Sequence, residues 1–254
     1  MVRPLSELSK TIPGLIEVVE DLGRQQVRWR QRGGAEGRNA AQIATEADRL
    51  SAEHLRKTLH RLFPDDGLVG EELPDEWPSR ERVWVIDPLD GTRNYAHGLP
   101  IWGISLALMI DAAPVLGVFH LPDAPETFHA IRGEGAHLDG EPLAAPHRDG
   151  LGSKDLVTVG GFDFPADFAK GLLRRLGCSV AEQCYLAAGR LAAMHLSGPR
   201  LWDVAAGSLI AREAGCTVRR LDDVPLWPWQ PRRSGAGGRF SLGGWGPGVK
   251  PNGE

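Results

Sequence analysis

The chain has 254 residues with ordinary proportions of hydrophobic (42%) and charged (24%) side chains, and its net charge at pH 7 is −4. This length and composition fit a soluble globular protein with one large core or two modest lobes, and the negative charge argues against nucleic acid as the main partner. Apolar runs are too short to span a membrane and the N-terminus lacks a signal-peptide segment, so we expect a cytoplasmic protein that does not bind membranes.

Cysteine is rare in the chain, and its spacing includes no CxxC pair. Three cysteines predict neither a disulfide framework nor a zinc site. We expect them to pack as small apolar groups. They are Cys178, Cys184 and Cys216.

Two helices are expected in the first quarter of the chain. Apolar residues at helical spacing predict the first over residues 5–32, with a bend near Pro13. A second helix is expected to open at residues 44–48, where Thr45 and Asp48 have the spacing of a capping box. The intervening loop is predicted from three glycines, Gly33, Gly34 and Gly37.

The most informative stretch is residues 84–95, Trp-Val-Ile-Asp-Pro-Leu-Asp-Gly-Thr-Arg-Asn-Tyr. An apolar run typical of a buried strand ends there in two acids, Asp87 and Asp90. Pro88 is expected to end the strand, which would place both carboxylates at its carboxyl end, where α/β sheets bind ligands. With the carbonyl of Leu89 they would offer several oxygens to Mg²⁺. The alternative is an ordinary Asx-type turn.

Three β-rich runs follow, at residues 101–110, 114–121 and 126–131, and they predict an antiparallel meander. Its histidines, at spacings that match no metal motif, are expected to be packing or surface residues: His120, His129 and His137. Polar residues 143–154 predict a lobe boundary. We therefore divide the chain into an N-terminal metal-binding α+β lobe (1–145), a C-terminal α/β lobe (146–224) and a Trp/Pro/Gly-rich tail (225–254).

The second lobe is expected to alternate strands and helices. Strands are predicted at 156–159, 191–196 and 216–221, and helices at 167–176, 179–189 and 204–214. Asp203 immediately precedes the last helix, where it would serve as an N-cap. The tail lacks periodicity, so we expect it to be partly loop or disordered.

Three motifs, taken in order, resemble those of the inositol monophosphatase family of Mg²⁺-dependent phosphomonoesterases. They are Gly70-Glu71-Glu72, Asp87 to Tyr95, and Trp202 to Gly207. The resemblance runs from about residue 40 to residue 222. It implies an α/β protein with the layered αβαβα sandwich of the sugar-phosphatase fold. It also implies a homodimer and inhibition by Li⁺.

The resemblance implies a role for each matching residue. Asp48 would hydrogen-bond Thr92, and the two would orient and deprotonate the attacking water; Glu71 would join them in catalysis. Gly91 and Thr92 would bind the phosphate of a small phosphorylated metabolite. The cofactor would be two or three Mg²⁺ ions, held by Glu71, Asp87, the Leu89 carbonyl, Asp90 and Asp203.

The electrostatics of the acids support this assignment. Four carboxylates that converge within a few ångström repel one another, and their pKa values rise unless cations are present. Divalent ions would remove that repulsion, clamp the phosphate and lower the pKa of a bound water.

Substrate choice is predicted less sharply. Inositol phosphatases have an acid for sugar hydroxyls at the position that Leu196 occupies here, Ser179 lies in a segment that departs from the usual pattern, and Arg200 adds a cation. We expect a small sugar or polyol phosphate as substrate. Histidinol phosphate, a nucleotide 3′-phosphate and fructose 1,6-bisphosphate remain alternatives. A non-catalytic metal- or phosphate-binding module is the alternative from another class.

Overall fold

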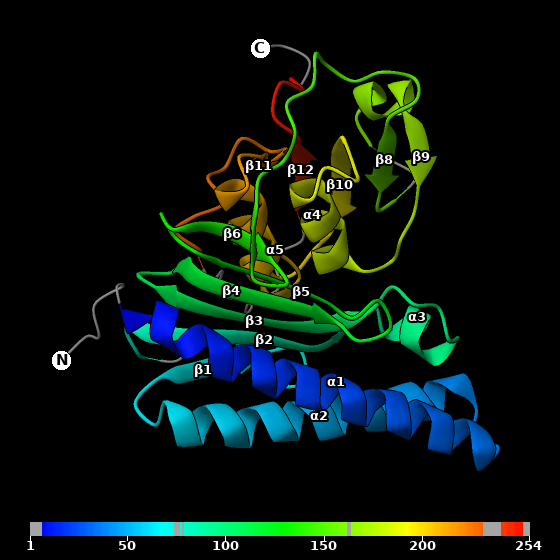
Figure 1. Cartoon of the computed structure of the whole chain (residues 1–254), viewed down its shortest axis with the longest axis vertical. Helices are drawn as coiled ribbons and strands as arrows, with labels where there is room; N and C mark the ends of the chain where they lie inside the picture. The colour runs from blue at the N-terminus through cyan, green and yellow to red at the C-terminus, as the bar shows by residue number, and fades with distance from the viewer. Residues whose placement is uncertain (1–6, 74–76, 78, 162–163, 231–239, 251–254) are drawn as a thin grey trace.

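The computed structural model describes residues 7–73, 77, 79–161, 164–230 and 240–250. Helices α1 (Ile12–Ala35) and α2 (Ala40–Leu62) cover one face of a seven-stranded sheet (Figure 1). Helices α4 (Ser179–Ala187) and α5 (Leu201–Glu213) lie between that sheet and a second sheet of five strands. The predicted layered α/β fold is confirmed.

The first sheet is mostly an antiparallel meander, as predicted. Strand β1 is parallel to β2, and each later strand is antiparallel to the one before it. The strands are β1 (Gly67–Gly70), β2 (Arg82–Asp90), β3 (Gly103–Ile110), β4 (Ala113–Leu121), β5 (Glu126–Ile131), β6 (Gly135–Leu138) and β7 (Glu141–Leu143). A short helix, α3 (Thr92–Ala96), connects β2 to β3.

The histidines of the meander pack as predicted. His120 is buried and shares a 2.9 Å hydrogen bond between its Nδ1 and Thr127 Oγ1. His129 and His137 are cross-strand neighbours whose rings stack 4.7 Å apart. Burial lowers the pKa of His120 to about 4, so this side chain is neutral at pH 7.

The second sheet has the order β11-β12-β10-β8-β9. Its strands are β8 (Leu156–Val159), β9 (Leu172–Arg174), β10 (Ala193–Ser197), β11 (Thr217–Arg220) and β12 (Ser241–Trp245). One prediction was wrong here. Residues 167–176 form no α-helix, because they contain the 3-10 helix η3 (Ala166–Lys170) and β9.

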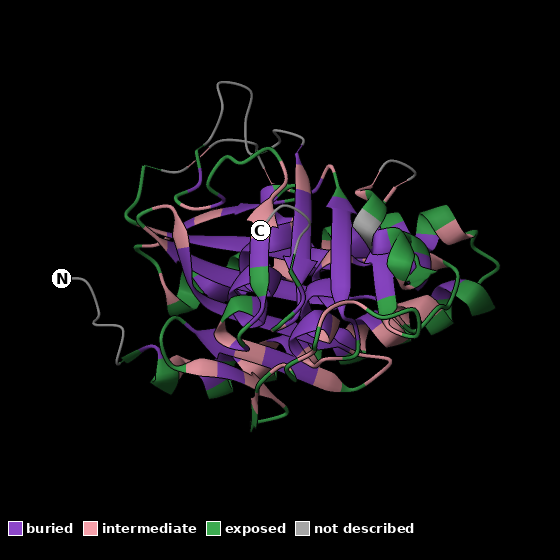
Figure 2. Cartoon of the chain, turned by 90° about the horizontal axis from the view of Figure 1, so that it is seen from above, coloured by how far each residue is buried: buried purple, intermediate pink, exposed green. Residues whose placement is uncertain are grey.

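The tail, expected to be partly loop or disordered, also contributes a strand that the sequence did not predict: β12, which lies between β11 and β10. Residues 231–239 and 251–254 of the tail lie outside the described residues. In the view from above, β10 and β12 are almost wholly buried (Figure 2). Apolar side chains of η3 and neighbouring loops cover their outer face, including Phe164, Phe168 and Val249.

The first two helices begin and end at different residues from those predicted. A 3-10 turn, η2 (Ser9–Thr11), precedes α1, and Pro13 lies in the first turn of α1, where its missing N–H costs nothing. Gly33 and Gly34 continue the helix instead of forming a loop. Asn39 caps α2 and forms the capping box with Gln42, so the predicted Thr45–Asp48 box was wrong.

No helix in the described part of the chain is long and apolar enough to cross a membrane. The largest core cluster joins α4 and α5 to both sheets, and a second cluster joins α1 and α2 to the first sheet. Strand β2 contributes to both: Val83 and Val85 face the first cluster, and Trp84 and Ile86 face the second. Because successive side chains of a strand point to opposite faces of the sheet, Asp87 points to the same face as Val83 and Val85, toward α5.

Candidate functional site

A bulge in β2 places Asp87 and Asp90 on the same side of the sheet. Asp87 pairs with Ser105 and Asp90 with Gly103, so three steps along β2 match two steps along β3. Because residues two apart on β3 share a face, both aspartates share it as well. The prediction that Pro88 ends the strand was wrong, since a bulge leaves one residue out of the ladder and tolerates a missing N–H.

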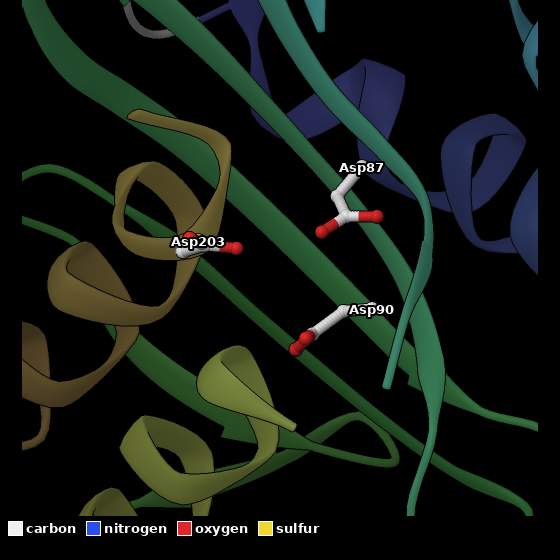
Figure 3. Close-up of side chains that lie close together, drawn as sticks. All are labelled: Asp87, Asp90 and Asp203. Atoms are coloured by element: carbon white, nitrogen blue, oxygen red, sulfur yellow. The ribbon is translucent and has the colours of Figure 1, made fainter. Parts of the chain in front are cut away.

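Helix α5 brings Asp203 to the same space. One carboxylate oxygen from each of Asp87, Asp90 and Asp203 lies within 4.8 Å of the other two. Figure 3 shows the three side chains converging from β2 and α5. Asp203 is in the first turn of α5 and is not the N-cap that the sequence predicts: it accepts the backbone N–H of Arg200, the capping residue, over 2.6 Å.

Strand pairing also explains the position of Glu71. Strand β1 ends at Gly70, immediately before Glu71, and runs parallel to β2 with Gly70 opposite Ile86. The next residue on each side, Glu71 and Asp87, therefore lies at the same level of the sheet. Glu71 is exposed, and it is not among the three acids whose carboxylate oxygens converge. Its negative charge nevertheless raises the pKa values of Asp48, Asp87 and Asp203, so it belongs to the same cluster.

Asp48 approaches the cluster from α2. It lies in the middle of the helix and is 7% exposed, on the face that carries Ala44, Ala47 and Ser51. Its Oδ1 atom is buried and has no hydrogen-bond partner among the described residues. A buried carboxylate oxygen without a partner is costly, which suggests that it serves a ligand or a water.

Burial and mutual repulsion raise the pKa values of these acids. Burial is the largest cause for each, and neighbouring carboxylates add to it. The pKa of Asp48 rises to about 8 and that of Asp203 to about 7. The pKa of Asp87 rises well above its ordinary value, because it is buried beside Asp90, Glu71, Asp203 and Asp48.

Asp90 has more protein donors than Asp87 or Asp203, each of which accepts one backbone N–H. Its carboxylate accepts the backbone N–H groups of Ser179 (3.1 Å) and Val180 (2.6 Å) at the start of α4. The thiol of Cys178 lies 3.0 Å from Asp90 Oδ2 and is fully buried. Burial raises the pKa of Asp90, while these three donors oppose the rise. Sequence analysis missed this contact, because Cys178 is 88 residues away and resembles an ordinary core cysteine.

Gly91 and Thr92 follow the bulge. Gly91 has φ of +82°, and a Cβ there would lie 2.9 Å from Ile101 O, so glycine is required. The Thr92 hydroxyl donates to the carbonyl of Leu89 over 2.9 Å. The hydroxyl proton is therefore not directed at Asp48, contrary to the hydrogen bond that the resemblance implies. The Leu89 carbonyl keeps a second lone pair for another partner.

Comparison with known proteins agrees with this geometry. The sequence profile of the inositol monophosphatase family matches residues 6–239. The chain belongs to the inositol monophosphatase family. The Nus factor SuhB of Pasteurella multocida is 36% identical over 189 residues, which cover 68% of this chain and 70% of that protein.

Two further members of the family show the range of the similarity. A histidinol-phosphatase of Chlorobaculum parvum is 48% identical over 100 residues, 39% of this chain and 38% of that protein. The solved structure of the inositol monophosphatase of Anabaena is 25% identical and superposes with a TM-score of 0.76, covering 96% of this chain and 93% of that one.

The predicted specificity residues differ in their access to the site. Arg200 is exposed, stacks its guanidinium 5.4 Å from the Trp202 ring centre, and its charge lowers the pKa values of Glu71 and Asp203. Ser179 begins α4 and contributes its backbone N–H to Asp90. Leu196 is 4% exposed and packs in the largest core cluster.

These residues fit the metal dependence of the inositol monophosphatase family. The donors are all oxygens, which is the set that Mg²⁺ prefers. They are also crowded acids whose pKa values are raised first by burial and then by the neighbouring carboxylates, both of which a bound cation would offset. The structure therefore supplies a place for a hard divalent ion.

Proposed function

We propose that this family member is a Mg²⁺-dependent phosphomonoesterase that acts on a small sugar or polyol phosphate. The observation that carries the proposal is the convergence of Asp87, Asp90 and Asp203 within 4.8 Å. Glu71 and the Leu89 carbonyl would complete the ligand set for two or three ions. When bound, Mg²⁺ neutralises the acids and stabilises the charge that develops on the phosphate and on the leaving oxygen.

Asp48 and Thr92 would act on the attacking water. Asp48 Oδ1 is buried and lacks a partner among the described residues, so it can accept a proton from a water held beside it. Thr92 donates its hydroxyl proton to Leu89, which leaves the Oγ1 lone pairs to accept a hydrogen bond from that water. The two oxygens would hold the water in line with phosphorus.

Gly91 and Thr92 would offer backbone N–H groups to the substrate phosphate. Helix α3, which begins at Thr92, has five residues, so these two amides rather than a helix dipole would make the contact. Arg200 stands at the exposed rim of the acids, where a cation could meet a second anionic or polar group of the substrate.

Substrate choice within the family is the finer part of the proposal. Leu196 is buried and apolar, so the chain lacks a carboxylate there for sugar hydroxyls. This feature keeps histidinol phosphate as a second candidate, and the similar Chlorobaculum protein is a histidinol-phosphatase. A nucleotide 3′-phosphate and fructose 1,6-bisphosphate belong to the same panel.

The proposed function is tested by measuring phosphate release from sugar, polyol, nucleotide and histidinol phosphates, with Mg²⁺ and with EDTA. We expect Mg²⁺-dependent release from at least one ester and inhibition of that release by Li⁺. If no ester is hydrolysed while Mg²⁺ still binds, a non-catalytic metal- or phosphate-binding module replaces the proposal.

Two further proposals accompany this function. We propose that the protein is a homodimer and that it acts in the cytoplasm on a metabolite, without a nucleic-acid or membrane partner. Light scattering after gel filtration tests the first, because a monomer mass would contradict it. Binding to an RNA oligonucleotide at moderate salt would contradict the second.

A further inference from the structure

Two glutamines are fully buried, which is unusual for this side chain. They are Gln26 on α1 and Gln183 on α4, and each is 0% exposed. In both, Nε2 donates hydrogen bonds while Oε1 is buried without a partner among the described residues. A buried amide that is only half satisfied calls for an explanation beyond packing.

Gln26 holds the bulge that carries Asp87 and Asp90. Its Nε2 donates to the carbonyl of Pro88 over 2.8 Å, inside the bulge, and to Ser51 Oγ over 2.8 Å. Ser51 is one helical turn after Asp48 on α2. One amide group therefore joins the backbone between Asp87 and Asp90 to α2, the helix that carries Asp48.

The orientation of the Gln26 amide is fixed by its partners. Pro88 O can only accept a hydrogen bond, so the NH₂ group and not Oε1 must face it. The backbone carbonyl of Gln26 also accepts the Tyr95 hydroxyl over 2.7 Å, three residues beyond Thr92. Gln26 thus contacts the stretch from Asp87 to Tyr95 at two points, Pro88 and Tyr95.

Gln183 makes the matching contacts in the second half of the site. Its Nε2 donates to the carbonyl of Asp203 over 2.7 Å and to that of Ser179 over 2.9 Å. The first carbonyl belongs to the acid on α5, and the second to the residue whose N–H binds Asp90. At Gly207 a Cβ would lie 2.8 Å from Gln183, so α5 packs directly on this side chain.

We propose that Gln26 and Gln183 are positioning residues that set the spacing of Asp87, Asp90 and Asp203 for the divalent ion. Each holds a main-chain carbonyl at or beside an acid. The inference rests on the proposed function only for the identity of the ion as Mg²⁺.

The test replaces each amide with methionine, which has a similar volume and no N–H donor. Gln26→Met and Gln183→Met are titrated with Mg²⁺ by calorimetry, without any substrate, and their thermal unfolding is recorded in EDTA. Loss of groups that orient metal ligands lowers metal affinity by about 10- to 100-fold, which is the result we expect. Gln25→Met is the matched control: it is the same substitution on the neighbouring residue of α1, outside these contacts, and should bind Mg²⁺ as the unaltered chain does.

The readouts separate positioning from packing. A role in packing alone would lower the unfolding temperature and leave the Mg²⁺ dissociation constant of the folded variant within about twofold of the original. That result in both variants would overturn the proposal. If a methionine variant does not fold, Gln26→Asn or Gln183→Asn replaces it. The shorter side chain keeps an amide but places its NH₂ group too far from the carbonyl acceptors, so it should weaken Mg²⁺ binding in the same way.

The calorimetric result also separates the positioning role of the glutamines from the proposed function. An unaltered chain that binds Mg²⁺ but hydrolyses no ester would contradict the proposed function and leave the positioning role intact. An unaltered chain that does not bind Mg²⁺ would overturn both.

Discussion

The two ends of the bulge in β2 hold their aspartates in different ways. Asp90 accepts two backbone N–H groups at the start of α4 and contacts the Cys178 thiol, so protein donors surround its charge. Asp87 accepts the N–H of Leu89 over 3.0 Å and otherwise lies among carboxylates that raise its pKa. Both side chains are buried: Asp90 is 6% exposed and Asp87 is 1% exposed.

The difference shows how the site divides its tasks. Protein donors to Asp90 oppose the rise in its pKa that burial causes, and they tie the first sheet to α4. Burial and negative neighbours raise the pKa of Asp87, so a bound cation would favour its charged form. We therefore expect Asp90 to support the fold as well as the proposed metal site, and Asp87 to serve the metal site alone.

Asp87→Asn is expected to have the largest effect on activity. Losing a metal ligand removes several kcal/mol of transition-state stabilisation, so Mg²⁺-dependent phosphate release should fall by at least about a thousandfold. The fold should persist, and in EDTA near neutral pH the variant should be more stable than the original because a crowded acid is gone. Turnover like that of the unaltered chain would refute the metal assignment.

Thr92→Ala should have a smaller effect and a different pattern. We expect turnover to fall by about 100-fold, the usual contribution of groups that handle a reacting proton, while Mg²⁺ affinity stays the same. Steady-state kinetics and calorimetry on one preparation measure both quantities. An unchanged rate would remove Thr92 from the activation of water.

The pH dependence of stability without metal tests the crowding directly. Folding raises the pKa of Asp48 from 3.8 to about 8, so the stability that this acid contributes is present below its unfolded pKa and is lost as pH rises toward the folded one. Between about pH 5 and pH 8.5 the loss should be on the order of a few kcal/mol, measured by urea unfolding in EDTA.

Asp48→Asn is the matched control for this experiment. It lacks the titrating group, so the difference between the two unfolding curves isolates Asp48 from His120, whose lowered pKa acts in the opposite direction. A difference that does not change with pH would contradict the predicted pKa shift.

The stability of the metal-free Asp90→Asn variant tests the contrast between Asp90 and Asp87. The substitution should weaken activity as well, but unlike Asp87→Asn it should destabilise the metal-free protein, by about 2 kcal/mol, because charge-assisted hydrogen bonds to Ser179 and Val180 are lost. Urea unfolding of both variants in EDTA gives the sign of each change. The same sign for both would break the contrast between the two ends of the bulge.

Cys178→Ala is expected to have the smallest effect. It removes one neutral contact to Asp90 and leaves both backbone N–H groups in place, so the free energy of unfolding should fall by about 1 kcal/mol. Mg²⁺ affinity should change little. A loss of Mg²⁺ affinity as large as that of Asp90→Asn would make the thiol, and not the amides, the main support of this acid.

The sequence was sufficient for the parts of the site that follow from periodicity. Glu71 was expected from the family resemblance, because its alignment with Asp87 depends on the pairing of β1 with β2. Alternation along β2 directs Asp87 to one face, and an acid at the start of a helix marks Asp203. These depend on local patterns that survive folding unchanged. The meander and the helices α4 and α5 were predictable for the same reason.

Other features depend on contacts between distant residues. Gln26 meets Pro88 from 62 positions away, and glutamine is normally a surface residue, so its sequence carries no sign of burial. Strand β12 includes Gly243 and Gly244, which disfavour strands, but a Cβ at either would meet the side chains of Trp245 or Met194 within 3 Å. Close packing selects glycine there, and no local pattern reports it.

The most direct test of the central claim is a calorimetric titration of the metal-free protein with Mg²⁺, with Asp87→Asn and Asp203→Asn alongside. We predict saturable binding to the unaltered chain and its loss in both variants, since Asp87 and Asp203 are two of the three acids that converge at the proposed site. Equal binding by all three proteins, or none by the unaltered chain, would contradict the account.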